Sequence, residues 1–336
     1  MTLEGSKNGI QYYLTANVTR LKDVNVWSDA TIQVFYSLGV SFGNLITMSS
    51  YSKFKSNCHR DAILVSFINC GTSFFAGLVV FSILGVMAKT EEKTIAEVVS
   101  SGPQLAFVTY PKAVLDMPVS PLWSFLFFSM LFSLALSSMI PSVSNINTAV
   151  IDQLSLQRKK HYVTIGTCTI MFLGGLPMCC NGGYYMFDLF DKVSASWNSL
   201  LIALIEVIIA AWLYGANTII KNIKQMEIWM PKILERYWKL CWFFITPVLL
   251  ATLLVMQFIN AKPLTYDPPL DGEYPAGIQA LGWLLPITPI GVILAFSIQH
   301  IITSFRTGDS LGWTLFRPTS NWGPPDYLLC TVTETG

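Results

Sequence analysis

The sequence predicts an all-α membrane protein, on the evidence of its hydropathy, its low charge and its repeated long apolar stretches. Of its 336 residues, 52% are hydrophobic and 12% are charged, and the mean hydropathy is +0.51. A protein surface that faces water cannot tolerate such values. Each apolar stretch is long enough to cross about 30 Å of hydrocarbon as a helix. We therefore expect lipid to be the main solvent of this chain.

Seven transmembrane helices are expected, separated by short segments that hold most of the charged residues. They cover residues 29–50, 62–88, 122–151, 162–179, 184–214, 238–259 and 277–302. Residues 1–28 are then an extracellular segment, and residues 29–303 form the transmembrane bundle. Residues 304–336 contain repeated Gly and Pro and are predicted to be an irregular cytoplasmic tail.

The cationic residues predict the orientation, because cytoplasmic loops carry an excess of Lys and Arg. They cluster after the first, third and fifth spans, at Lys53, Lys55, Arg60, Arg158, Lys159, Lys160, Lys221, Lys224 and Lys232. With seven spans, the N-terminus lies outside and the C-terminus in the cytoplasm, as in a multi-pass protein of the plasma membrane. The sequon at Asn17 falls in the outer segment, where Asn17 is a candidate for glycosylation.

The net charge and the motifs of the sequence disfavour several function classes. A net charge of +1 provides no basic field for nucleic acid. We recognise no Ser-His-Asp arrangement, Walker loop or HExxH motif, so we expect neither an enzyme nor a bound cofactor. A channel is harder to exclude by composition, and saturable, gradient-dependent flux would distinguish it from a transporter.

The first span contains an unusual interruption at residues 37–43, Ser-Leu-Gly-Val-Ser-Phe-Gly. Two glycines weaken a helix by about 1 kcal/mol each relative to alanine, so a break is predicted there. Backbone released from a helix at membrane depth must be buried in protein or line a polar cavity. The break is therefore a candidate binding site.

Polar side chains of three spans accompany this break. Gln33 and Ser37 lie four residues apart on one helical face of the first span, and Asn69 and Ser73 have the same spacing in the second. The third span carries hydroxyl-bearing residues at 133–138. These groups suit a hard cation, but hydrogen bonding and close packing between helices would use the same residues.

The order of several motifs resembles the neurotransmitter:sodium symporter family, and particularly its invertebrate-type nutrient amino acid transporters. The matching segments are residues 26–30, 33–39, 50–54, 57–61, 68–70, 101–103, 105–111 and 212–215. The family has twelve spans, of which the first ten form two inverted repeats, as in the bacterial leucine transporter. The resemblance implies that our seven spans correspond to the sixth through twelfth. The partner repeat, with half of each binding site, is then expected upstream of Met1.

The resemblance also implies roles for individual residues. The implied sodium ligands are Ser37 and Asn69 for one ion, and Leu134, Ser137 and Ser138 for the second. The implied chloride ligands are Gln33, Ser37, Asn69 and Ser73. The implied substrate contacts are Tyr36, Ser37, Gly39 and Phe42. Tyr51 and Asp152 match the intracellular gate, and Asp191 matches the carboxylate of the extracellular gate.

The leading hypothesis is therefore symport of an amino acid or related small amine with sodium, and with chloride as a second co-transported ion. Ser137 stands where monoamine carriers typically have Asp, which favours an amino acid. One departure from the family pattern is Pro141, which removes a helical donor and is expected to kink the third span. The alternative hypothesis is a truncated chain that does not transport and acts as a regulatory membrane subunit.

Overall fold

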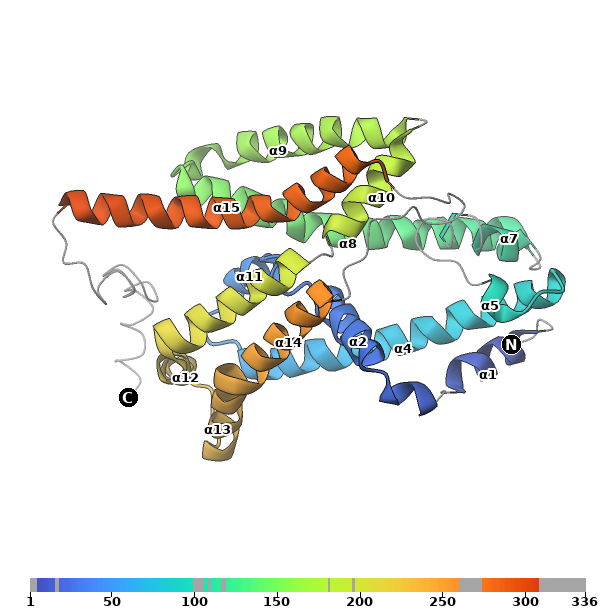
Figure 1. Cartoon of the computed structure of the whole chain (residues 1–336), viewed down its shortest axis with the longest axis horizontal. Helices are drawn as coiled ribbons and strands as arrows, with labels where there is room; N and C mark the ends of the chain where they lie inside the picture. The colour runs from blue at the N-terminus through green and yellow to red at the C-terminus, as the bar shows by residue number, and fades with distance from the viewer. Residues whose placement is uncertain are drawn as a thin grey trace. The chain divides into compact units, whose positions relative to one another are not determined.

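The computed structural model describes residues 5–15, 18–98, 106–107, 110–115, 119–180, 182–194, 197–259 and 274–307. These residues form helices joined by turns and contain no strand (Figure 1). Six helical stretches among them are long and apolar enough to cross a membrane. They are Cys58–Thr90, Ser120–Gln153, Gln157–Cys179, Gly183–Gln225, Lys232–Ile259 and Ala276–Thr303. The prediction of an all-α, multi-pass membrane protein is confirmed, and the remaining predicted span is the interrupted one.

The chain divides into two compact units, of which the first comprises Met1–Leu38 and Arg60–Ile146. Its helical segments are α1 (Ser6–Leu14), η1 (Val18–Lys22), α2 (Val24–Ser37), α4 (Cys58–Thr90), α5 (Ile95–Val98), α7 (Tyr110–Leu115) and α8 (Ser120–Gln153), whose last residues belong to the second unit. The helix α1 packs on the second half of α4, where a Cβ added to Gly85 would lie 2.6 Å from the carbonyl oxygen of Gly5. The ring of Tyr13 stacks on Phe81 at 4.9 Å. Glycine at this crossing therefore lets the two backbones approach closely.

The second unit comprises Gly39–His59 and Asn147–Gly336. Its segments are α3 (Asn44–Ser50), η3 (Gln157–Lys159), α9 (Lys160–Gly175), η4 (Leu176–Cys179), α10 (Gly183–Ser194), α11 (Trp197–Ile208), the π-helical η5 (Ile209–Gly215), α12 (Ala216–Gln225), α13 (Lys232–Leu240), the π-helical η6 (Cys241–Ile245), α14 (Thr246–Ile259) and α15 (Ala276–Thr307). The helices α11 and α14 pack together, with Leu200 and Leu250 buried. The rings of Trp197 and Phe258 lie 5.4 Å apart, so the start of α11 meets the end of α14.

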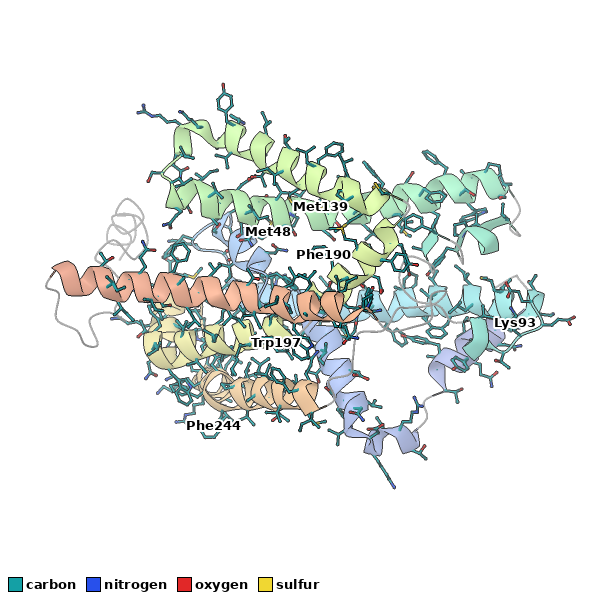
Figure 2. The ribbon with its side chains drawn as sticks, turned by 45° about the horizontal axis from the view of Figure 1, so that its top comes forward. Met48, Lys93, Met139, Phe190, Trp197 and Phe244 are labelled. Carbon is teal, nitrogen blue, oxygen red and sulfur yellow. The ribbon has the colours of Figure 1, made fainter. Side chains whose placement is uncertain are left out.

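The long helices expose much of their apolar surface, and side chains project from them on several sides (Figure 2). In the most apolar window of Ser120–Gln153, and in that of Gln157–Cys179, 0% of the residues are buried. Apolar surface of this extent is unfavourable in water, and a helix satisfies its own backbone hydrogen bonds in lipid. Lipid or further protein must therefore cover these helices.

Helix boundaries differ from the sequence prediction mainly by extension. The fifth predicted span ends at residue 214, whereas helical structure continues through η5 and α12 to Gln225. The last helix runs to Thr307 and so includes the first residues of the predicted tail. The remainder of that tail and the candidate glycosylation site at Asn17 lie outside the described residues.

Candidate functional site

The interruption of the first predicted span is present in the structure. Helix α2 ends at Ser37, and α3 begins at Asn44. Three residues between them have positive φ angles: Gly39 at 63°, Ser41 at 71° and Gly43 at 76°. L-residues rarely adopt this left-handed conformation, and a helix cannot continue through it. The predicted break is thus confirmed, and it contains the candidate substrate residues Gly39 and Phe42.

A hydrogen bond in the first unit joins the end of α2 to α4. The hydroxyl of Ser37 donates to Oδ1 of Asn69 at 3.0 Å. These are the residues predicted to bind the first sodium ion, and they are 32 positions apart in the sequence. Gln33 lies one turn before Ser37 on α2, and Ser73 lies one turn after Asn69 on α4. The structure therefore brings two members of the candidate chloride site together and places the other two one helical turn away.

The three candidate ligands of the second sodium ion lie on α8, within the same turn. The hydroxyl of Ser137 donates to the carbonyl oxygen of Leu134 at 2.8 Å. The carbonyl oxygen of Ser138 accepts a hydrogen bond from the hydroxyl of Ser142 at 3.0 Å. The helix continues through Pro141, which has no N–H to donate to the carbonyl of Ser137 four residues earlier. This turn is consequently rich in oxygen atoms, and one carbonyl lacks its helical donor.

The two residues of the candidate intracellular gate, Tyr51 and Asp152, both lie in the second unit. The hydroxyls of Tyr51 and Thr148 lie 3.3 Å apart, and Asp152 follows Thr148 by one helical turn on α8. Oδ1 of Asp152 accepts a hydrogen bond from Nε2 of Gln157 at 3.0 Å. Neither Thr148 nor Gln157 was among the residues predicted from the sequence. The spacing of four residues between Thr148 and Asp152 is a signal that could have identified the former.

Two of the predicted cytoplasmic loops meet in the second unit. Nζ of Lys55, after the first predicted span, lies 2.5 Å from Oε1 of Glu227, which follows the fifth. The same loop region contains the ion pair between Lys224 and Glu235, also at 2.5 Å. Both loops must lie on one side of a membrane for Lys55 and Glu227 to form this ion pair. That geometry is compatible with the orientation expected from the positive charges.

The candidate aromatic residues and the external carboxylate occupy exposed positions. Tyr36, near the end of α2, is 43% exposed, and Phe42, within the break, is 39% exposed. Asp191 lies on the exposed side of α10, together with Phe190, which is labelled in Figure 2. A second carboxylate of α10, Asp188, is buried. It was not among the site residues predicted from the sequence.

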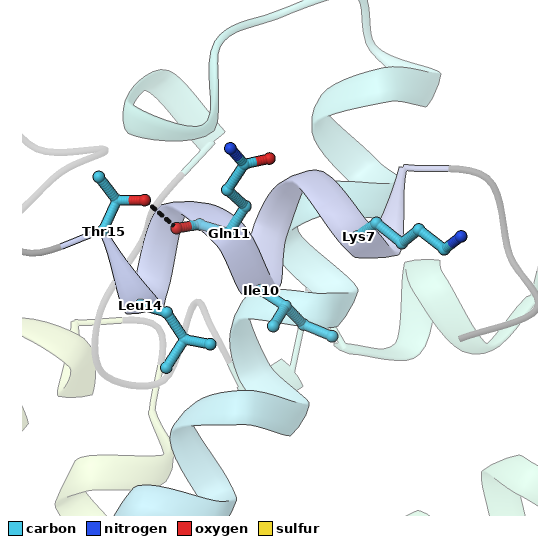
Figure 3. Close-up of a pocket in the computed structure, with 5 residues that line it drawn as sticks. All are labelled: Lys7, Ile10, Gln11, Leu14 and Thr15. Carbon is cyan, nitrogen blue, oxygen red and sulfur yellow. Dashed lines mark hydrogen bonds between the residues drawn. The ribbon is translucent and has the colours of Figure 1, made fainter.

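A shallow hollow of about 410 Å³ lies elsewhere, along α1 (Figure 3). It is lined by Lys7, Ile10, Gln11, Leu14 and Thr15, none of which belongs to the predicted sites. Its lining comes from one face of one helix, and the hydroxyl of Thr15 is bonded to the carbonyl of Gln11 at 2.6 Å. The hollow therefore contributes nothing to the candidate transport site.

Comparison with known proteins identifies relatives with transport functions. The model of the sodium:neurotransmitter symporter family matches residues 1–304. The mouse sodium- and chloride-dependent neutral and basic amino acid transporter B(0+) is 41% identical over 327 residues, which are 96% of this chain and 51% of the relative. The human sodium- and chloride-dependent GABA transporter 2 is 40% identical over 308 residues, 90% of this chain and 50% of the relative.

A third relative is the Xenopus laevis sodium- and chloride-dependent glycine transporter 1, which is 39% identical over 330 residues. The match covers 96% of this chain and 51% of that relative. The chain thus spans about half the length of the relatives that it matches.

Proposed function

Because the chain belongs to the sodium:neurotransmitter symporter family, we propose that it supplies one half of a site for sodium-driven transport of an amino acid. The hydrogen bond between Ser37 and Asn69 is the observation that carries this proposal. It joins the end of a broken helix to a polar residue of a continuous apolar helix, with oxygen atoms that suit a hard cation. We assign the remaining contacts to the part that corresponds to the half of the relatives that this chain does not match.

The proposed solute site is the interruption between α2 and α3. Backbone groups that leave the helical pattern between Ser37 and Asn44 are available to the polar groups of an amino acid. Tyr36 and Phe42 flank this backbone and pack against the apolar part of the solute. An amino acid is favoured over a monoamine because Ser137 provides a hydroxyl where an Asp carboxylate is typical of monoamine carriers.

We assign parts of two sodium sites and one chloride site to this chain. Ser37 and Asn69 contribute to the first sodium site, and Leu134, Ser137 and Ser138 to the second. Gln33, Ser37, Asn69 and Ser73 provide neutral donors for chloride, whose charge offsets that of sodium in a medium of low dielectric. Ser73 carries no charge of its own, so an exchangeable anion is required at this position.

The gates and the orientation complete the proposal. Tyr51 and Asp152 close the site on the cytoplasmic side, and Asp191 contributes to closure on the outside. Residues 1–28 are extracellular, with Asn17 as a glycosylation site, residues 29–303 form the bundle, and residues 304–336 are cytoplasmic. The protein operates in the plasma membrane.

Radiolabelled amino acid uptake tests the proposal, in cells that express this chain joined after the N-terminal half of the mouse B(0+) relative. We expect saturable uptake that is lost when choline replaces sodium and reduced when gluconate replaces chloride. Ser73→Glu places a fixed negative charge at the chloride site, so uptake by this variant should persist without chloride. Ser66→Glu, two turns earlier on α4, is the matched control and should not remove the chloride requirement. Sodium-independent uptake at unchanged surface expression would refute the proposal.

A further inference from the structure

Helix α10 carries a buried carboxylate that the proposed transport site does not use. The side chain of Asp188 is 7% exposed, and its Oδ2 lies 2.8 Å from Nζ of Lys192, four residues later on the same helix. The hydroxyl of Tyr274 donates to the same oxygen atom at 2.6 Å. A carboxylate in such a position is strongly unfavourable unless charged and polar partners surround it. Lys192 and Tyr274 therefore stabilise Asp188 in its buried position.

Tyr274 connects this carboxylate to the start of α15. Its side chain is almost fully buried, its hydroxyl lies 3.3 Å from the carbonyl oxygen of Tyr185, and its own carbonyl accepts from Nε2 of Gln279 at 3.0 Å. Nζ of Lys192 lies 6.0 Å from the centre of the Tyr274 ring, within the range of a cation–π contact. Tyr274 also packs with Leu189 and Val193, so polar and apolar contacts coincide where α10 meets α15 (Figure 1).

The contacts with Tyr274 and α15 involve one face of α10. With 100° between successive residues, Asp188, Leu189, Lys192 and Val193 fall within an arc of about 140°. Asp191 is about 60° from Asp188 in the other direction, beyond the edge of this arc, and it is exposed. The direction in which Asp191 points is thus determined by which face of α10 contacts α15.

We propose that Asp188, Lys192 and Tyr274 are positioning residues for the external gate, because they fix the rotation of α10 and hence the orientation of Asp191. This proposal rests on the transport function and on the gate role assigned to Asp191. Apolar contacts between helices have little directionality, whereas a rotation of α10 would separate Asp188 from the hydroxyl of Tyr274. The three residues therefore oppose rotation more strongly than Leu189 and Val193 alone.

Tyr274→Phe is the informative substitution, since it removes one hydroxyl and keeps the buried ring. In the transport-active protein described above, we expect KM for the amino acid to rise about threefold to tenfold, with kcat changed less than twofold. Tyr162→Phe, at an exposed tyrosine of α9, is the matched control and should leave both parameters unchanged. A KM within twofold of the parent value for Tyr274→Phe, at equal surface expression, would overturn the proposal.

A second measurement reports rotation without requiring transport. Phe187→Cys places a thiol one turn before Asp191, and its rate of modification by a membrane-impermeant methanethiosulfonate reagent is measured with Cys179 and Cys180 replaced by Ala. We expect Tyr274→Phe to change this rate at least threefold. An unchanged rate contradicts the positioning role even if the melting temperature falls, because loss of stability alone does not reorient α10. A changed rate in a protein that takes up no solute would instead refute the proposed function and leave the positioning of α10 supported.

Discussion

The α2–α3 segment and helix α8 respond differently to residues that disfavour helices. The first contains no proline between Val24 and Ser50, and yet its helix stops at Ser37 and resumes at Asn44. The second contains Pro141 and remains helical from Ser120 to Gln153. The helix α15 likewise continues through Pro286 and Pro289. Glycine and serine in the left-handed conformation therefore interrupt this protein more completely than proline does.

The reason lies in the backbone angles that each residue adopts. Proline is restricted to φ near −65°, which a helix accepts, and it removes a single donor from the ladder. Positive φ at Gly39, Ser41 and Gly43 directs the chain out of the helix altogether. The break consequently changes the hydrogen bonding of several peptide groups, whereas Pro141 affects the carbonyl of Ser137. The first region is therefore the one we propose for binding the solute and an ion, and the second is the one we propose for coordinating a further ion.

Restoring the helix at the break should have the largest effect. In the triple variant Gly39→Ala, Ser41→Ala, Gly43→Ala, alanine at the two glycine positions alone favours the helix by roughly 2 kcal/mol, a shift of about 30-fold in the local equilibrium. We expect sodium-dependent uptake to fall by at least this factor. Uptake assays at matched surface expression measure the loss.

Gly166→Ala, in the continuous helix α9, is the control for this experiment. A Cβ at that position would meet no atom within 4 Å, so uptake should be unaffected. Retention of more than half of the parent uptake by the triple variant would contradict the proposal that the interrupted backbone binds the solute.

Removing the polar contact beside the break should have the next largest effect. Ser37→Ala and Asn69→Ala each delete an oxygen of the candidate sodium site, and a contact with a charged group contributes about 1.5–3 kcal/mol. We expect the sodium concentration for half-maximal uptake to rise about tenfold or more in each variant. Because the two side chains form a hydrogen bond, the double variant should be less impaired than the sum predicts.

Ser66→Ala is the matched control on α4, since the Ser66 hydroxyl bonds within its own helix, to the carbonyl of Ala62. Its sodium dependence should equal that of the parent. Independent, additive effects of Ser37→Ala and Asn69→Ala would contradict a shared site.

The features of the α2–α3 break and of the polar residues beside it that could be predicted from the sequence depend on local residue properties. Gly39 and Gly43 disfavour a helix through their own conformational freedom, and the pairs Gln33/Ser37 and Asn69/Ser73 follow from helical spacing. Long apolar runs likewise predict transmembrane helices from the local sequence alone. The resemblance to a known family then related Ser37 to Asn69, which spacing alone could not do. The structure confirms that these two residues are in contact.

The parts that could not be predicted depend on tertiary contacts. The pairing of Asp188 with Lys192 is visible as a spacing of four residues, but nothing local indicates that Tyr274 reaches the same oxygen atom from 86 positions away. The partner of Tyr51, Thr148, is 97 positions away. The packing of α1 on α4 brings the backbones of Gly5 and Gly9 against that of Gly85, and a glycine in a sequence gives no sign of its neighbour. Only the three-dimensional arrangement identifies these contacts.

The smallest effect is expected at Pro141, where one hydrogen bond is at issue. Pro141→Ala restores a donor to the carbonyl of Ser137, and so makes that oxygen less available to the second sodium ion. Proline within a helix costs about 3 kcal/mol, of which part should be recovered as a higher melting temperature. We expect a more stable protein whose sodium concentration for half-maximal uptake is about threefold higher.

Pro289→Ala in α15 distinguishes ion binding from a general effect of helix repair. Pro289 also lies within a continuous helix, and its removal restores a donor to the carbonyl of Leu285, but no candidate ion ligand lies on α15. Melting temperature should therefore rise in both variants, whereas sodium dependence should change only in Pro141→Ala. An equal change in both would mean that helix stiffness, rather than the carbonyl of Ser137, controls sodium affinity. The difference between the break and α8 would then be one of flexibility and not of ion coordination.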